Sequence, residues 1–230
     1  MEITQKTWNR YISRLRQLNE AAASQMEKYI ETHDITTEDG IQNAIDVAYA
    51  LSTKYGEGAA ALSCEMYDAV ATLSGKNVPP AEPAETATYD EAAKTVQGIL
   101  KKSILPQSVG AGVGRMVKLA GVDTTLKNGM RDGAEFAWIP VGDTCPFCLM
   151  LASNGWRHIS KKALKKGHAE HIHSNCDCTY AVRFNSDTDV AGYNPNKIMA
   201  RFDGIDGNSW KEKMNTMRRE QYEKSKEEKE

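Results

Sequence analysis

The chain lacks the features of a membrane or secreted protein. No apolar run in its 230 residues approaches the roughly 20 needed to span a bilayer. The first residues, Met1 to Trp8, lack the apolar core of a secretory signal. An excess of positive charge is also absent, because the formal net charge is −2, whereas a general nucleic-acid coat protein would be clearly basic. These absences predict a protein that is assembled in the cytosol and has no membrane partner.

Cysteine is scarce and unevenly placed. The chain has five cysteines, and all except Cys64 lie between Cys145 and Cys178. Cys64 lies within a helical pattern and is expected to be a small buried apolar residue. Two disulfides would suit the clustered cysteines in a secreted protein. Without an export signal, metal binding is the favoured interpretation.

Helical periodicity dominates the first 76 residues. Apolar residues recur there at steps of three and four, which places them on one stripe of each helix. The pattern predicts a helix that ends at His33-Asp34, a capping box at residues 36–39, and a break at Gly56–Gly58. Gly75 is expected to terminate the last of these helices.

Residues 77–88 contain three prolines and are expected to form an extended, mobile linker. Helical periodicity returns at residues 89–104, where Pro106 is expected to end the helix. A glycine-containing pattern at 109–120 suggests another helix, and Asp123 can cap a further one that runs to Ala134.

Two segments change to the period of a strand, and the clustered cysteines lie between them. Residues 136–141 and 179–184 alternate as the residues of a strand would. Polar turns follow at residues 185–196, and residues 208–230 form a mixed-charge tail that suggests a fraying helix. The predicted fold is mainly α with a small α+β C-terminal module. Its parts are a helical region (1–76), the linker (77–88), a module at 89–207 with its metal site within 136–184, and the tail (208–230).

The clustered residues have the spacing of a zinc site. A CxxC pair points two thiolates at one ion, and an HxxCxC group supplies further ligands. Zinc needs four nitrogen or sulfur ligands, so one of the five must be spare, and the pattern favours one structural Zn²⁺ per chain. A bound ion would clamp the end of the first strand to the start of the second and close the segment between them. The candidate ligands are Cys145, Cys148, His173, Cys176 and Cys178.

Other interpretations of this region remain open. A redox CxxC would need a thioredoxin-like strand–helix unit, which is not evident. His168-Ala-Glu170 has the HxE spacing of zinc deaminases, but here it follows the CxxC instead of preceding it. A basic loop is either a solvated surface or a contact for DNA phosphate or an acidic protein. This loop contains Arg157, Lys161, Lys162, Lys165 and Lys166, interspersed with His158, His168 and His171.

The segments Gly142–Trp156 and His173–Cys178 resemble the Mu F-like minor head (head morphogenesis) proteins of tailed bacteriophages. That family carries a DxTCxxC half and an HxxCxC half in this order and at similar spacing. The segment Tyr55–Asp68 is similar to the helical region before the motif, so the resemblance covers roughly residues 45–185. It implies that the five candidate ligands occupy the family's metal positions. Asp143 and Thr144 match flanking positions, where we expect turn-stabilising hydrogen bonds.

The resemblance implies a minor capsid protein of the virion head, encoded near the portal gene and needed for head assembly or DNA delivery. Its expected partners are the portal protein and the major capsid or scaffold proteins, with DNA contact through the basic loop. Some relatives carry fused proteases or toxins, but no Ser/His/Asp arrangement is readable here, so no enzyme activity is expected. The alternatives are a cellular zinc-stabilised nucleic-acid-binding or regulatory module, and a zinc hydrolase or deaminase, which requires an open coordination position.

Overall fold

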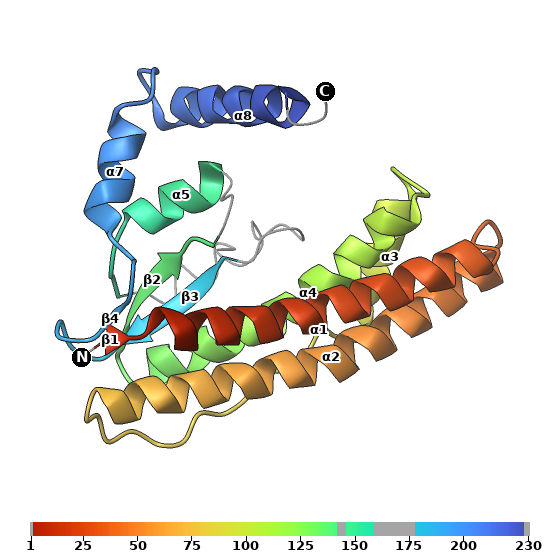
Figure 1. The fold of residues 1–230 in the computed structure, drawn as a ribbon. Helices are drawn as coiled ribbons and strands as arrows, with labels where there is room; N and C mark the ends of the chain where they lie inside the picture. Colours follow the sequence, from red (N-terminus) through yellow and green to blue (C-terminus); the bar gives the residue numbers. More distant parts are fainter. Residues whose placement is uncertain (1, 142–145, 159–177, 228–230) are drawn as a thin grey trace.

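The computed structural model describes residues 2–141, 146–158 and 178–227 of the chain. Among the described residues, four helices form a long arm, with paired strands at one end and three further helices beyond the strands (Figure 1). This architecture confirms the prediction of a mainly helical fold with a small β element. None of the described helices is both long and apolar enough to cross a bilayer. The elements are β1 (Glu2–Ile3), α1 (Gln5–Thr32), α2 (Glu38–Leu73), α3 (Tyr89–Leu100), α4 (Pro106–Arg131), β2 (Glu135–Ile139), α5 (Pro146–Ser153), β3 (Thr179–Arg183), β4 (Asp189–Val190), α7 (Pro195–Asp203) and α8 (Trp210–Glu227).

Helices α1 and α2 form an antiparallel pair that runs the length of the arm. The predicted end of α1 at His33 and the left-handed Gly75 after α2 (φ +62°) are confirmed. Thr37 caps α2 by accepting a hydrogen bond from the Gly40 amide at 3.1 Å. The reciprocal half of a capping box is missing, because the third helical residue is glycine. On the surface the two helices are linked by an Arg14–Glu65 ion pair of 3.1 Å.

The predicted break at Gly56–Gly58 is wrong, since α2 is continuous through both glycines. A Cβ atom on Gly56 would lie 3.0 Å from Thr86 Cγ2 and 3.4 Å from Ala120 Cβ. The glycine therefore lets neighbouring segments approach the helix closely, and packing outweighs its low helix propensity.

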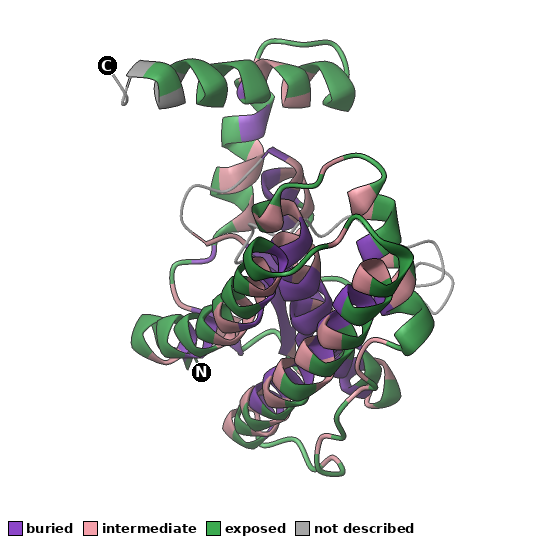
Figure 2. Cartoon of the chain, turned by 90° about the vertical axis from the view of Figure 1, so that its right-hand side faces the viewer, coloured by how far each residue is buried: buried purple, intermediate pink, exposed green. Residues whose placement is uncertain are grey.

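Helix α4 is the centre of the arm. It packs against α1, α2 and α3 and reaches β3, and it is buried on nearly all sides (Figure 2). The prediction that Asp123 starts a new helix is wrong, because α4 continues to Arg131. Pro106 also does not end α3, which stops at Leu100; it is the first residue of α4, where a missing N–H costs nothing.

Two core clusters share these helices. The arm core is drawn from α1, α2, α3 and α4 and includes Met26, Ile45, Val96, Val113 and Val117. The sheet-end core adds the strands and α5 and includes Trp8, Tyr67, Val122, Trp138 and Tyr180. Because α1, α2 and α4 contribute to both clusters, the apolar core is continuous along the arm.

The proline-rich segment 77–88 runs along α4 without helix or strand. The amide of Glu82 donates to the buried Asn128 side chain and that of Ala84 to Thr124 Oγ1, both at 2.9 Å. The Ala81 amide donates to Asp68 on α2, also at 2.9 Å. The segment is thus tied to both helices, in contrast to the mobile spacer expected from its composition.

The predicted strands at 136–141 and 179–184 are confirmed as β2 and β3, which pair antiparallel. Both faces are buried, because α4 covers one side and α5 lies on β2, so the alternation in sequence does not reflect a solvent-facing side. A second ladder was missed: β1 pairs in parallel with β4, where Ile3 lies opposite Val190. Helix α7, which begins at Pro195 where the predicted polar turns end, was also missed, whereas the predicted tail helix is present as α8.

Candidate metal centre at the paired strand ends

The β2–β3 ladder brings the two halves of the cysteine motif to one end of the sheet. Its last pair is Ile139 opposite Thr179, so the chain leaves β2 and enters β3 at the same edge. Cys178 lies directly before Thr179, and Cys148 lies in the first turn of α5, shortly after β2. The sequence predicted that these two strand ends meet, and the register confirms that they do.

Both described thiols are buried. The exposed fraction is 1% for Cys178 and 2% for Cys148, and both belong to the sheet-end core. The backbone N–H of Val141 donates to the Cys178 sulfur at 3.4 Å. A backbone N–H aimed at sulfur stabilises a thiolate more than a thiol, and so does the N-terminal turn of a helix, where Cys148 lies. Both environments therefore suit metal-ligating sulfur.

The other three candidate ligands, Cys145, His173 and Cys176, fall outside the described residues, as do Asp143 and Thr144. Within residues 2–141, 146–158 and 178–227, no three His, Cys, Asp or Glu side chains gather in a way that could hold an ion. The structure thus places two of the five candidate ligands. The ligand set and the metal stay predictions.

The segment after α5 adds a third stretch of backbone beside β2. Arg157 bridges to Phe136 through two backbone hydrogen bonds, of 2.8 and 2.9 Å, and its side chain donates to the Asn154 carbonyl at 2.8 Å. His158 Nδ1 lies 3.3 Å from the Ala134 carbonyl oxygen. The basic loop thus begins at a fixed strand edge, and its four lysines lie outside the described residues.

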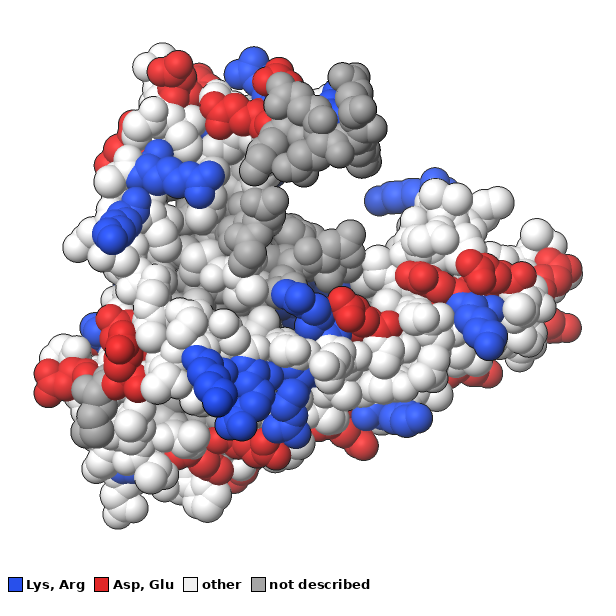
Figure 3. All heavy atoms as spheres, viewed as in Figure 1, with Lys and Arg blue, Asp and Glu red and all other residues white. Residues whose placement is uncertain are grey.

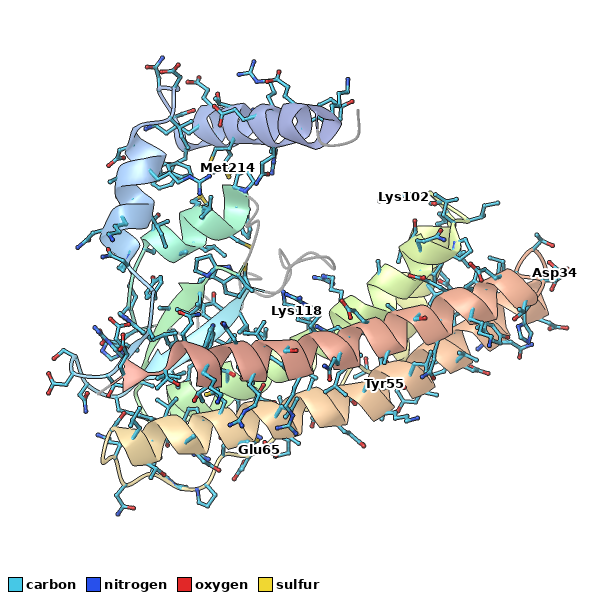
Figure 4. All side chains as sticks on the ribbon, in the orientation of Figure 1. Asp34, Tyr55, Glu65, Lys102, Lys118 and Met214 are labelled. Carbon is cyan, nitrogen blue, oxygen red and sulfur yellow. The ribbon has the colours of Figure 1, made fainter. Side chains whose placement is uncertain are left out.

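A lysine that sequence analysis did not single out lies against the sheet. Lys118 of α4 is only 6% exposed, and its ammonium is 5.9 Å from the Trp138 ring centre (Figure 4). The Trp138 ring packs edge-on against Tyr180, 4.7 Å away between centres, and burial raises the Tyr180 pKa to about 12. The feature of the sequence that could have revealed this side chain is a lysine placed among the apolar residues of the 109–120 pattern.

Polar side chains on the outer edge of the sheet hold the strands in register. Arg183 Nε donates to Glu135 at 2.7 Å, between the two ends of one cross-strand pair. The Arg183 guanidinium also lies 4.9 Å from the Trp156 ring centre, and Trp156 Nε1 donates to Asp189 at 3.2 Å. This network links β2, β3 and β4 to the segment that follows α5, at the Glu135–Arg183 end of the ladder and away from the Ile139–Thr179 pair that adjoins the cysteine site.

A pocket of about 300 Å³ adjoins the strand ends. Trp8 and Asn9 of α1 line one side, Ile139 and Val141 another, and Tyr193 a third. Trp8 is 2% exposed, and its indole N–H has no hydrogen-bond partner among the described residues. Val141, whose backbone N–H donates to the Cys178 sulfur, also lines this pocket, so the thiol site and the pocket share this residue.

Comparison with known proteins gives one match. A family model described as VG15 protein matches residues 2–205, from β1 through α7. No curated protein and no solved structure matches the chain.

Proposed function

This chain belongs to the VG15 protein family, and from that membership we propose that it is a minor structural protein of a phage head that acts near the portal in head assembly or DNA delivery. The match to residues 2–205 is the observation that carries the proposal, since it includes the helical arm and the sheet end together. The order and spacing of the two cysteine halves, which resemble those of Mu F-like head proteins, support the narrower role. The proposal assigns no catalytic residue to the chain.

In this proposal the cysteine site is structural. Cys148 and Cys178 would hold one zinc ion together with two of Cys145, His173 and Cys176. A bound zinc ion would supply a cross-link between these side chains. The buried thiols, the amide aimed at Cys178 and the shared strand end support this assignment. The role of these side chains is to close the segment between α5 and β3.

The proposed partners are the portal protein and the major capsid or scaffold proteins, which the helical arm would contact. DNA contact is proposed for Arg157 with Lys161, Lys162, Lys165 and Lys166. Support for this contact is the position of Arg157, which is exposed at the edge of β2 while its backbone is fixed by the bridge to Phe136. Positive side chains on a fixed edge suit phosphate binding without sequence specificity.

Metal analysis of the purified chain tests the zinc site, with Cys64 as the matched control. We expect about one zinc per chain in the wild type and in Cys64→Ser, because Cys64 lies on α2 apart from the other cysteines. Cys148→Ser and Cys178→Ser should lose zinc and melt at least about 5 °C lower, which corresponds to about 2 kcal/mol for a chain of this size. Wild-type protein without zinc under reducing conditions would contradict the site.

Co-expression with the portal protein encoded by the same genome tests the proposed role. We expect the two proteins to co-purify at physiological salt. Replacing Arg157, Lys161, Lys162, Lys165 and Lys166 by glutamine should leave this complex intact while weakening DNA binding. A chain that binds DNA but neither portal nor capsid proteins would favour the nucleic-acid-binding alternative.

A further inference from the structure

The free end of the arm carries an apolar groove. It has a volume of about 660 Å³ and lies between the α1–α2 turn and the connection from α3 to α4. The groove lies at the opposite end of the arm from the strands and the described thiols (Figure 1). Its apolar lining includes Ile30, Ile35, Ile41, Ile45, Leu100 and Ile104.

Two strongly exposed aliphatic side chains lie at the rim of this groove. Ile104 is 73% exposed and Leu105 is 60% exposed, both in the connection between α3 and α4. An apolar cavity beside two protruding apolar side chains forms an exposed hydrophobic patch, and such patches are typical of interaction sites. Because the protruding side chains and the groove are adjacent, one patch can place its side chains in a partner's groove and accept the partner's side chains in its own.

Charge is divided between the two walls. Residues 31–39, from the end of α1 to the first residues of α2, carry four carboxylates (Glu31, Asp34, Glu38, Asp39) and no lysine or arginine. Residues 100–106, on the opposite wall, carry Lys101 and Lys102 and no carboxylate. Figure 4 shows Asp34 and Lys102 on separate tips of the arm, and the tip that carries Lys102 is blue in Figure 3. Glu38 and Lys101 themselves line the groove.

We propose that this end of the arm is a self-association surface, whose occupant is the same surface of a second copy of the chain. A two-fold axis parallel to the groove sets two grooves mouth to mouth and places the basic wall of each copy against the acidic wall of the other. An axis across the groove would instead place the acidic wall of one copy against the acidic wall of the other. Charge thus selects one of the two symmetric arrangements, and in it the Ile104–Leu105 pair of each copy enters the other's groove.

This surface uses none of the cysteine-site residues, and self-association is measured on the purified chain alone, so its test is separate from those of the metal site and the portal contact. Sedimentation velocity of the full chain over a range of micromolar concentrations tests it. We expect a monomer–dimer equilibrium for the wild type. Ile104→Ser/Leu105→Ser should be monomeric with unchanged helical circular dichroism, because both side chains are exposed.

Tyr222→Ser is the matched control, since it removes a side chain that is 61% exposed on α8, away from the groove. It should associate like the wild type. A wild type that remains monomeric throughout, or a dimer that survives the Ile104→Ser/Leu105→Ser change, would overturn the proposal.

Charge exchange distinguishes a second copy from an unrelated partner. Lys101→Glu or Glu38→Lys alone puts like charges across the two-fold interface and should raise the dimer dissociation constant at least tenfold. The double variant Lys101→Glu/Glu38→Lys restores opposite charges and should return it to within about threefold of wild type. If the double variant associates no better than either single one, the two-fold arrangement is wrong.

Discussion

At the scale of single residues, the strongest polar interactions lie where α2, α4 and the proline-rich segment meet. Arg131 donates to both carboxylate oxygens of Asp132 at 2.8 Å and to the carbonyls of Pro79 and Pro80. Tyr67 on α2 donates its hydroxyl to Asp132 at 2.6 Å. The Arg131 guanidinium holds the pKa of Asp132 below its usual value, and burial together with Asp132 raises the Tyr67 pKa. Asp132 and Arg131 together therefore join three segments.

Asp132→Asn should lower the free energy of unfolding at pH 7 by about 1–3 kcal/mol, because an amide NH₂ then faces one of the two donors. Since the folded-state pKa of Asp132 is lowered, its contribution is present above the unfolded pKa of about 4 and is lost as pH falls through the folded value. The difference between wild type and variant should shrink below about pH 4 in urea titrations. Asp203→Asn, at an exposed carboxylate of α7, is the control and should change little. A difference that is constant with pH would contradict the assignment.

At the scale of elements, α4 shows why a glycine-rich helix is stable here. A Cβ on Gly110 would lie 2.7 Å from the Ala23 carbonyl oxygen, and one on Gly114 would lie 3.1 Å from that of Asn19. These glycines, one turn apart, let the α4 backbone approach α1. The close packing offsets about 1 kcal/mol of lost helix propensity per glycine.

Gly110→Ala should therefore destabilise the protein by about 1–3 kcal/mol, although alanine is the better helix former. Gly98→Ala is the matched substitution, since Gly98 is exposed on α3 and has no atom within 4 Å of a built Cβ. It should stabilise the protein by roughly 0.5–1 kcal/mol. Thermal unfolding followed by circular dichroism measures both. Equal shifts in the same direction would show that contact with α1 does not decide the effect.

The same elements show what could be predicted from sequence. Amphipathic periodicity located α1, and the change to a strand period located β2 and β3, because each pattern is local. Helix α4 was predicted as two helices because the low helix propensity of its glycines and of Asp123 suggests breaks. The packing of neighbouring helices around α4 cannot be read from propensity. The β1–β4 pair was missed because two-residue strands from distant parts of the chain have no period. At the candidate site, the meeting of the strand ends was predictable, whereas a choice of four ligands from five is not encoded in spacing.

At the scale of the whole molecule, the continuous core predicts that arm and sheet end unfold together. Helices α1, α2 and α4 each contribute to both core clusters, so neither cluster can lose its helices alone. Trp8 and Trp138 are buried in the sheet-end core, Trp156 packs against that core, and Trp210 lies on α8. In a Trp210→Phe background, tryptophan fluorescence thus reports the sheet end, while far-ultraviolet circular dichroism reports mainly the helices.

We expect the two signals to give one midpoint in urea. Val113→Ala, in the arm core, should shift both midpoints equally and lower stability by roughly 2 kcal/mol, through the lost burial and the cavity that remains. The fluorescence shift is the informative one, because Val113 lies in the arm core and the reporting tryptophans lie at the sheet end. A shift seen only by circular dichroism would mean that the arm unfolds separately, and that the shared helices do not transmit stability to the strand ends that present the cysteine site.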